Sequence, residues 1–121
     1  MRVGVFTALL AQMPLPQVLA KLKSLGVNTV ELGTGNYPTD PHCKLSMLEN
    51  KAALKEFKAT LDGEGFTISA LSCHGEPLHP DKDYRKQQQE TNRKTILLAE
   101  KLGVPAIIDF SGCPGGGPKE T

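Results

Sequence analysis

Four short apolar runs divide the chain at intervals. Each is rich in β-branched or aliphatic residues and is bounded by glycine or polar residues, and the runs are Val3–Thr7, Val27–Leu32, Phe66–Leu71 and Val104–Phe110. Runs of this length and composition are typical of buried strands. Their near-continuous apolar character favours a parallel sheet that is covered on its faces. The pattern therefore predicts four parallel strands.

Between these runs, apolar residues recur at three- and four-residue steps, which indicates three amphipathic helices. Their apolar faces carry Leu15, Val18, Leu19, Leu22 and Leu25 in the first helix, Leu54, Phe57 and Leu61 in the second, and Ile96, Ala99 and Leu102, with Leu98 beside them, in the third. Pro16 suits the first turn of a helix, and we expect Gly26, Gly63 and Gly65 at helix ends. The first half of the third helix, Tyr84–Lys94, is almost wholly polar, so it is either solvated or poorly packed.

The element order is therefore β-α-β-α-β-α-β, an α/β class with right-handed crossovers. A doubly wound open sheet and a closed barrel both begin this way. Long polar segments follow the strands, at Gly33–Ser46, Ser72–Asp83 and Ser111–Thr121, and we expect function there. No glycine follows the first strand, which disfavours a nucleotide-binding loop. Gly115–Gly117 precedes no predicted helix, so we expect a flexible loop rather than a phosphate cradle.

Composition fits one globular domain over residues 1–121, with 39% apolar residues, 22% charged residues and a net charge of +1. Neither nucleic acid nor a membrane is an expected partner, because the chain has no strong overall charge and no apolar run near the ~20 residues that span a bilayer. Cys43, Cys73 and Cys113 show no CxxC spacing. We therefore expect reduced thiols in a cytoplasmic protein, acting as small packing residues rather than as nucleophiles or zinc ligands.

Three segments carry a family resemblance. They are LGVNTVELGTGN (Leu25–Asn36), ISALSCHGEPLHPD (Ile68–Asp81) and AEKLGVPAIIDFSGCPGG (Ala99–Gly116). They resemble the sugar phosphate isomerase/epimerase group of the xylose-isomerase-like TIM barrels, whose superfamily includes the endonuclease IV type of DNA-repair enzyme. The resemblance implies the N-terminal half of a (β/α)₈ TIM barrel, with four strands and three helices. Since a complete barrel takes about 250 residues, we expect this chain to be a fragment truncated after its fourth strand.

The resemblance also implies a metal-dependent sugar (phosphate) isomerase or epimerase. Such an enzyme removes a proton next to a carbonyl while a divalent ion (Mn, Mg, Zn or Co) stabilises the enediolate. The main metal ligands and the catalytic acid–base groups are expected beyond Thr121, so the fragment alone should be inactive. Two alternatives are an endonuclease IV-like metal-dependent hydrolase and a non-enzymatic half-barrel binding module. The expected partners are a sugar or polyol and further copies of the chain, because two open sheet edges need covering.

The candidate substrate-binding residues follow or end the predicted strands, and they are Phe6, Glu31, His74, His79, Asp109 and Ser111. A carboxylate at Glu31 is costly to bury unless it is paired or ligating. The resemblance places a glutamate here at the barrel mouth, and a structural glutamate is the alternative. His74 suits a substrate hydroxyl better than a metal ion, with a structural loop histidine as the alternative.

The other candidates are less sharply defined. His79 lies in a proline-framed loop that either aims it over the pocket or leaves it on the surface. Strand alternation puts Asp109 and Ser111 together at the mouth and Phe110 on the opposite face. The alternative for Asp109 is a cap on the following turn. His42 lies in a polar loop and is expected at the surface.

Overall fold

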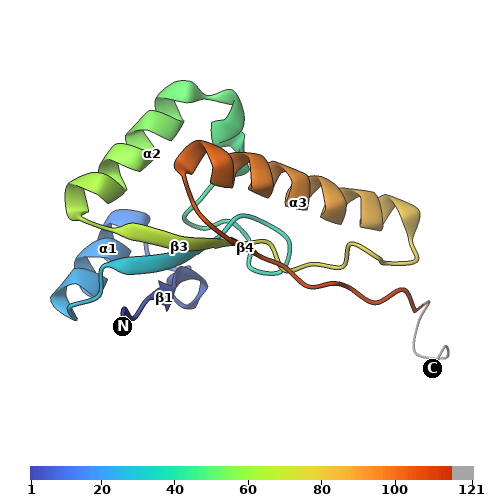
Figure 1. The fold of residues 1–121 in the computed structure, drawn as a ribbon, viewed down its shortest axis with the longest axis horizontal. Helices are drawn as coiled ribbons and strands as arrows, with labels where there is room; N and C mark the ends of the chain where they lie inside the picture. The colour runs from blue at the N-terminus through green and yellow to red at the C-terminus, as the bar shows by residue number, and fades with distance from the viewer. Residues whose placement is uncertain (116–121) are drawn as a thin grey trace.

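The computed structural model describes residues 1–115 and confirms the α/β order expected from the sequence. In chain order the elements are β1 (Val5–Phe6), η1 (Thr7–Leu10), α1 (Leu15–Ser24), β2 (Thr29–Gly33), η2 (Leu45–Glu49), α2 (Lys51–Glu64), β3 (Thr67–Ser72), α3 (Lys82–Leu102) and β4 (Ile107–Ile108), where η marks a short 3₁₀ helix (Figure 1). The expected loop at Gly115–Gly117 lies mostly outside the described residues.

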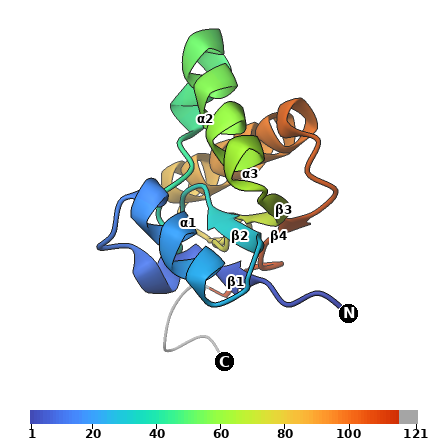
Figure 2. The ribbon, with the colours of Figure 1, turned by 90° about the vertical axis from the view of Figure 1, so that its left-hand side faces the viewer.

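Within residues 1–115 the strands form one parallel sheet in the order β1-β2-β3-β4. The helices α1, α2 and α3 all lie along one side of this curved row of strands (Figure 2). A doubly wound sheet reverses its strand order and carries helices on both faces. Sequential order with helices on one side is instead the arrangement of half a (β/α)₈ barrel.

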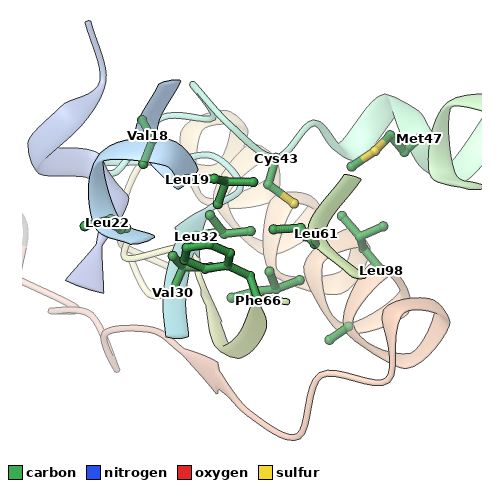
Figure 3. Close-up of a cluster of buried hydrophobic side chains, with 12 residues drawn as sticks. Val18, Leu19, Leu22, Val30, Leu32, Cys43, Met47, Leu61, Phe66 and Leu98 are labelled. Carbon is green, nitrogen blue, oxygen red and sulfur yellow. The ribbon is translucent and has the colours of Figure 1, made fainter. Parts of the chain in front are cut away.

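The core lies between the helices and the outer face of the strands (Figure 3). Its side chains come from every layer, and the largest fully buried ones include Leu19 from α1, Leu32 and Leu71 from the strands, and Leu98 from α3. Each such leucine contributes about 1.5–3 kcal/mol relative to an exposed position. The apolar stripes predicted for the helices therefore drive them onto the sheet. Two residues of the predicted stripes are exceptions because they are exposed: Leu25, which lies just beyond the end of α1, and Ile96, because Thr95 takes the buried position on α3.

Several expected boundaries move. Helix α2 runs through Gly63 and ends at Gly65, whose φ of 77° is the left-handed cap that glycine adopts without strain. Strands β1 and β4 are only two residues long, shorter than predicted, because each has a hydrogen-bonding neighbour on one side alone in the described sheet. The polar half of α3 is neither wholly solvated nor loose, since Gln88 is buried within it.

Candidate functional site

The sheet register sorts the strand side chains into two faces. Val30 and Leu32 belong to the core, so alternation turns Glu31, between them, to the opposite, inner face. Phe6 pairs with Glu31 across β1 and β2, and paired residues of parallel strands share a face. Ser72 shares this face, because its pairing partner Gly33 lies two residues beyond Glu31. The inner face therefore carries an aromatic ring, a carboxylate and a hydroxyl near the carboxyl ends of the strands.

Glu31 is the charged centre of this face. It lines an open inner hollow of about 550 Å³ together with Phe6 and Ser69, and this hollow extends to Arg2 and Pro105 at the amino ends of the strands. The hydroxyl of Ser72, which is fully buried, donates a hydrogen bond to Glu31 Oε1. A hydrogen bond from the neighbouring strand therefore fixes the carboxylate, which stays partly exposed to the hollow. It is placed to accept a hydrogen bond from a ligand hydroxyl.

His74, two residues beyond β3, lies between two aromatic rings. The imidazole stacks on Phe110 with ring centroids 4.7 Å apart and planes at 19°. Phe6 meets it edge-on at 6.1 Å. The ring of Tyr37 lies 6.4 Å from that of Phe110. This arrangement offers aromatic surface for the apolar face of a ligand and a ring nitrogen for hydrogen bonding.

The expected orientation around Asp109 is wrong, and the register explains why. Ile107 pairs with Leu71 and packs against the core, so Asp109, two residues later, also turns toward the helices. Its carboxylate accepts hydrogen bonds from Asn92 of α3 and from the backbone N–H of Gly75. Phe110 therefore takes the side that the sequence interpretation assigned to the Asp109 carboxylate, although Asp109 still lines the mouth together with Ser111.

A second hollow, of about 650 Å³, opens at the mouth above the rings. It is lined by residues that follow β2, β3 and β4: Tyr37, Gly75, Glu76, Asp109, Phe110, Ser111, Gly112 and Cys113. Ser111 is exposed here. The structure therefore brings five of the candidates to the inner face or the mouth: Phe6, Glu31, His74, Asp109 and Ser111. It also adds Tyr37, Ser72 and Phe110, which the sequence interpretation missed because a tyrosine in a loop and a phenylalanine beside a strand carry no distinctive signal.

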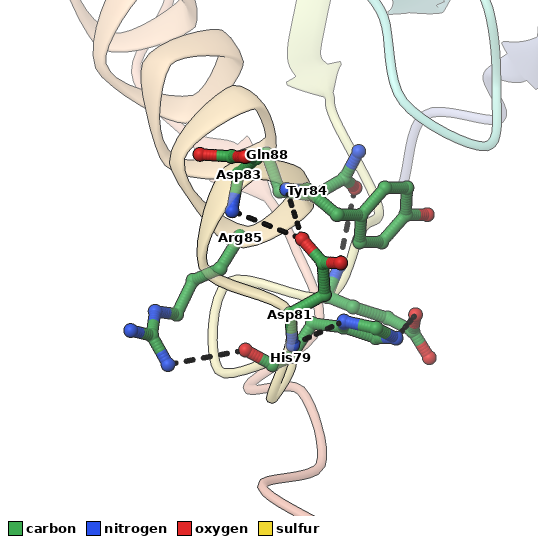
Figure 4. Close-up of polar contacts among 7 residues, drawn as sticks. His79, Asp81, Asp83, Tyr84, Arg85 and Gln88 are labelled. Atoms are coloured by element: carbon green, nitrogen blue, oxygen red, sulfur yellow. Dashed lines mark hydrogen bonds and ion pairs between the residues drawn. The ribbon is translucent and has the colours of Figure 1, made fainter. Parts of the chain in front are cut away.

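His79 lies at the start of α3 rather than in either hollow (Figure 4). Its Nδ1 accepts the backbone N–H of Asp81 at 3.1 Å, and its ring packs edge-on against Tyr84 at 4.7 Å. Asp81 in turn accepts the N–H groups of Asp83 and Tyr84, and these bonds hold the pKa of the Asp81 carboxyl below its usual range. The histidine thus helps to shape the helix N-terminus.

The expectation that His42 lies at the surface is wrong. The side chain is 6% exposed, and both ring nitrogens are bonded. Nδ1 lies 2.9 Å from Thr7 Oγ1, and Nε2 donates to the carbonyl of Met13 at 2.8 Å. The segment after β2 folds back over the connection between β1 and α1, which buries the imidazole. A polar loop sequence gives no sign of such a return.

The buried thiols are poor nucleophiles. Burial raises the pKa of Cys43 to about 12. Burial, followed by the nearby Asp109 carboxylate, raises the pKa of Cys73 to about 11. A thiolate is the reactive form of cysteine, so both residues act as small packing groups. Cys113 is free and exposed at the mouth, so the expectation that it also acts as a packing residue is wrong.

Residues 1–115 contain no group of three or more His, Cys, Asp or Glu side chains able to hold a metal ion. Glu31 and His74 supply two donor groups, whereas zinc sites use three or four protein ligands. The described residues alone therefore do not complete a metal centre. In the same part of the chain, none of the helices is long and apolar enough to cross a bilayer.

Comparisons with known proteins agree with this architecture. The family model of the xylose isomerase-like TIM barrel matches residues 19–121. Protein YfiH of Bacillus subtilis (strain 168) is 35% identical over 121 residues, covering 99% of this chain and 38% of that protein. The crystal structure of protein SMc04130 from Sinorhizobium meliloti 1021 matches with a TM-score of 0.62 at 18% identity, covering 97% of this chain and 38% of the other. The chain, which spans little more than a third of the length of both relatives, belongs to the xylose isomerase-like TIM barrel family.

Proposed function

We propose that this chain forms the substrate-facing half of a sugar or polyol isomerase or epimerase. The observation that carries the proposal is the placement of a carboxylate, Glu31, beside Phe6 on the inner face, and of an imidazole, His74, between Phe6 and Phe110. Sugars combine hydroxyl groups with apolar C–H faces, and this set of side chains complements both. In the family, such a face lies at the end of the barrel where substrates bind.

Each residue has a role that its contacts suggest. The stacked rings of His74 and Phe110 hold the C–H face of the substrate. Glu31, kept in place by Ser72, accepts a hydrogen bond from a substrate hydroxyl. Fixing the carbon chain in this way orients the C–H bond next to the carbonyl for proton transfer, and orientation of this kind supplies much of an enzyme's rate enhancement.

The negative charge at the mouth favours binding of an uncharged part of the substrate there over a phosphate group. Glu76 and Asp109 line the outer hollow, and the residues described there include no lysine or arginine. A phosphate group would meet carboxylates without a compensating cation. If the substrate is phosphorylated, its phosphate binds away from this half of the mouth.

The divalent ion expected for the family remains a proposal. Its remaining ligands, and the groups that move the proton, would come from residues other than those described. We therefore expect the 121-residue chain to bind Mn²⁺ or Zn²⁺ no more tightly than about 10 μM, or roughly −7 kcal/mol, by calorimetric titration. Sub-micromolar binding that His74→Ala abolishes would contradict this. Self-association and a cytoplasmic location also remain predictions.

The test uses the protein encoded by the complete coding sequence. It is incubated in D₂O with free and phosphorylated aldoses and ketoses in the presence of Mn²⁺, Mg²⁺, Zn²⁺ or Co²⁺, and proton NMR follows deuterium entry beside the carbonyl. We expect exchange with at least one sugar. Glu31→Gln should reduce kcat/KM by about 10- to 100-fold, because a hydrogen bond to a charged group contributes roughly 1.5–3 kcal/mol. His74→Ala should also lower it.

Glu49→Gln is the matched control, because it removes a carboxylate from an exposed position in η2. It should leave the exchange rate unchanged. No exchange with any sugar, or full activity in Glu31→Gln, would overturn the proposal. Cleavage of DNA at abasic sites by the same preparation would favour the hydrolase alternative.

A further inference from the structure

The polar half of α3 forms a buried seam. Gln88, Asn92 and Thr95 are spaced by four and three residues, which places them on one face of the helix. Gln88 is 8% exposed and Thr95 is fully buried. Burying amides and hydroxyls costs free energy unless they are hydrogen-bonded. Within residues 1–115, every buried side-chain nitrogen and oxygen has a partner.

The seam reaches the ends of three neighbouring strands. Each member bonds a residue that follows a different strand: Thr95 Oγ1 lies 2.8 Å from Thr34 Oγ1 after β2, Gln88 Oε1 accepts the Glu76 N–H at 3.2 Å after β3, and Asn92 donates to Asp109 after β4. One helix face therefore ties together three of the segments that surround the candidate site.

The backbone is held on both sides of His74. The side-chain amide of Asn36 donates to the carbonyl of Cys73 at 2.9 Å. The N–H of Gly75 donates to Asp109 Oδ1 at 3.1 Å. The two peptide groups that flank the imidazole residue are thus bonded to side chains from other segments.

Asn92 joins these two anchors into one chain. Its Oδ1 accepts from Asn36 Nδ2 at 3.2 Å, and its Nδ2 donates to Asp109 Oδ2. Asp109 Oδ1 also accepts the N–H of Phe110 at 2.8 Å. The same carboxylate therefore holds the backbone beside His74 and beside Phe110, the two rings that stack at the mouth.

The local backbone is built closely around this chain of side chains. A Cβ atom at Gly75 would lie 2.4 Å from Gln88 Oε1 and 2.6 Å from Asn36 Nδ2, so any larger residue would displace these two amide groups from their present positions. Asn36 itself adopts a φ of 56°, a left-handed conformation that is uncommon outside glycine and costs free energy. The structure retains this strain at the edge of the candidate site.

We propose that Asn92 and Asp109 are positioning residues that set the stack of His74 on Phe110, and so the orientation of the substrate. This inference rests on the proposed function, in which the two rings contact the substrate. The alternative is a clamp that stabilises the fold without affecting the rings. The two differ in what happens to the His74–Phe110 stack when the hydrogen bonds are changed.

A swap of the two side chains provides the test. Asn92→Asp alone sets two carboxylates against each other. The double variant Asn92→Asp/Asp109→Asn restores the pair, because the new amide donates to the new carboxylate while its oxygen still accepts the N–H groups of Gly75 and Phe110. Gln87→Glu makes the same amide-to-carboxylate change on the exposed face of α3 and serves as the matched control.

The first readout is independent of activity. Stacking on a phenylalanine ring shifts the His74 ring protons upfield in the NMR spectrum, and the chain has only three histidines to assign. We expect the shift to be lost in Asn92→Asp, restored in the double variant and unchanged in Gln87→Glu. Where a sugar substrate is found, kcat/KM should fall at least about tenfold in Asn92→Asp, recover in the double variant and stay unchanged in Gln87→Glu. A misplacement of about 1 Å can cost on the order of 100-fold.

An unchanged His74 shift in a folded Asn92→Asp protein would overturn the inference and leave a structural clamp. If that variant does not fold, Asn92→Ala decides, because it removes both hydrogen bonds of the Asn92 amide without adding a charge: a lost shift supports the inference, and an unchanged shift refutes it. If the parent protein exchanges no deuterium into any sugar, this counts against the proposed function alone. The His74 proton shifts of the variants still report on the position of the rings.

Discussion

Replacement of His42 by phenylalanine tests the buried imidazole most directly. Phenylalanine keeps a ring in the space but removes both nitrogens, so the fully buried Thr7 hydroxyl and the Met13 carbonyl lose their partners. A buried polar group left without a hydrogen bond costs roughly 1–3 kcal/mol, and the two together should therefore cost about 2–6 kcal/mol of unfolding free energy. That is a large part of the 5–15 kcal/mol of a typical domain.

Urea unfolding followed by circular dichroism measures this loss, provided that the m-value stays constant. The double variant Thr7→Val/His42→Phe should recover about 1 kcal/mol or more relative to His42→Phe, because the unpaired hydroxyl is gone. His79→Phe is a matched control at a more exposed ring, where water can bond the freed N–H, and it should lose less. A loss below about 0.5 kcal/mol in His42→Phe, the range of ordinary surface substitutions, would show that the two hydrogen bonds do not stabilise the loop.

Three further predictions concern the glycines and the thiols. Gly75→Ala should destabilise the protein by roughly 1–3 kcal/mol through overpacking against α3, whereas Gly63→Ala, with open space around its Cβ, should stabilise it by about 0.5–1 kcal/mol in the same urea assay. At pH 8 an alkylating reagent should modify Cys113 first, with Cys43 and Cys73 reacting only on unfolding; equal rates for all three, measured by mass spectrometry, would refute the burial argument. Folding raises the Cys43 pKa from 9.0 to about 12, so the contribution of this thiol to stability should be fully present below pH 9 and should be lost as the pH rises above it. Cys43→Ala should therefore lessen the fall in unfolding free energy between pH 8 and pH 10.5. An equal fall in parent and variant would contradict this.

The fold was largely predictable because its signals are local. The apolar stripe of α1 and the runs around Val30 and Leu71 are periodic in the sequence, and the same residues form the core. Pro16 and Gly103 stand at helix ends, as their backbone preferences require. The consecutive β-α units fitted an open sheet as well as a barrel, and the barrel was expected from the family resemblance of three segments, Leu25–Asn36, Ile68–Asp81 and Ala99–Gly116.

The candidate site was only partly predictable. Glu31 and His74 stand out because charged or polar residues at the ends of buried strands are unusual. The faces of Asp109 and Phe110 were assigned the wrong way round, since alternation relates neighbours along a strand without saying which of them faces the helices. That choice depends on the pairing of Ile107 with Leu71, a contact between segments more than thirty residues apart.

The sequence by itself determined the order of the elements, the apolar faces of the helices and the positions where polar side chains follow strands, because periodicity and backbone preference are properties of neighbouring residues. Only the tertiary structure decided that His42 is buried, that the polar half of α3 is a bonded seam, and that Asn36, Asn92 and Asp109 meet. A polar side chain has the same local sequence signature whether water or another side chain satisfies it. Its partner is chosen by how distant segments pack, and that choice is made by the fold as a whole.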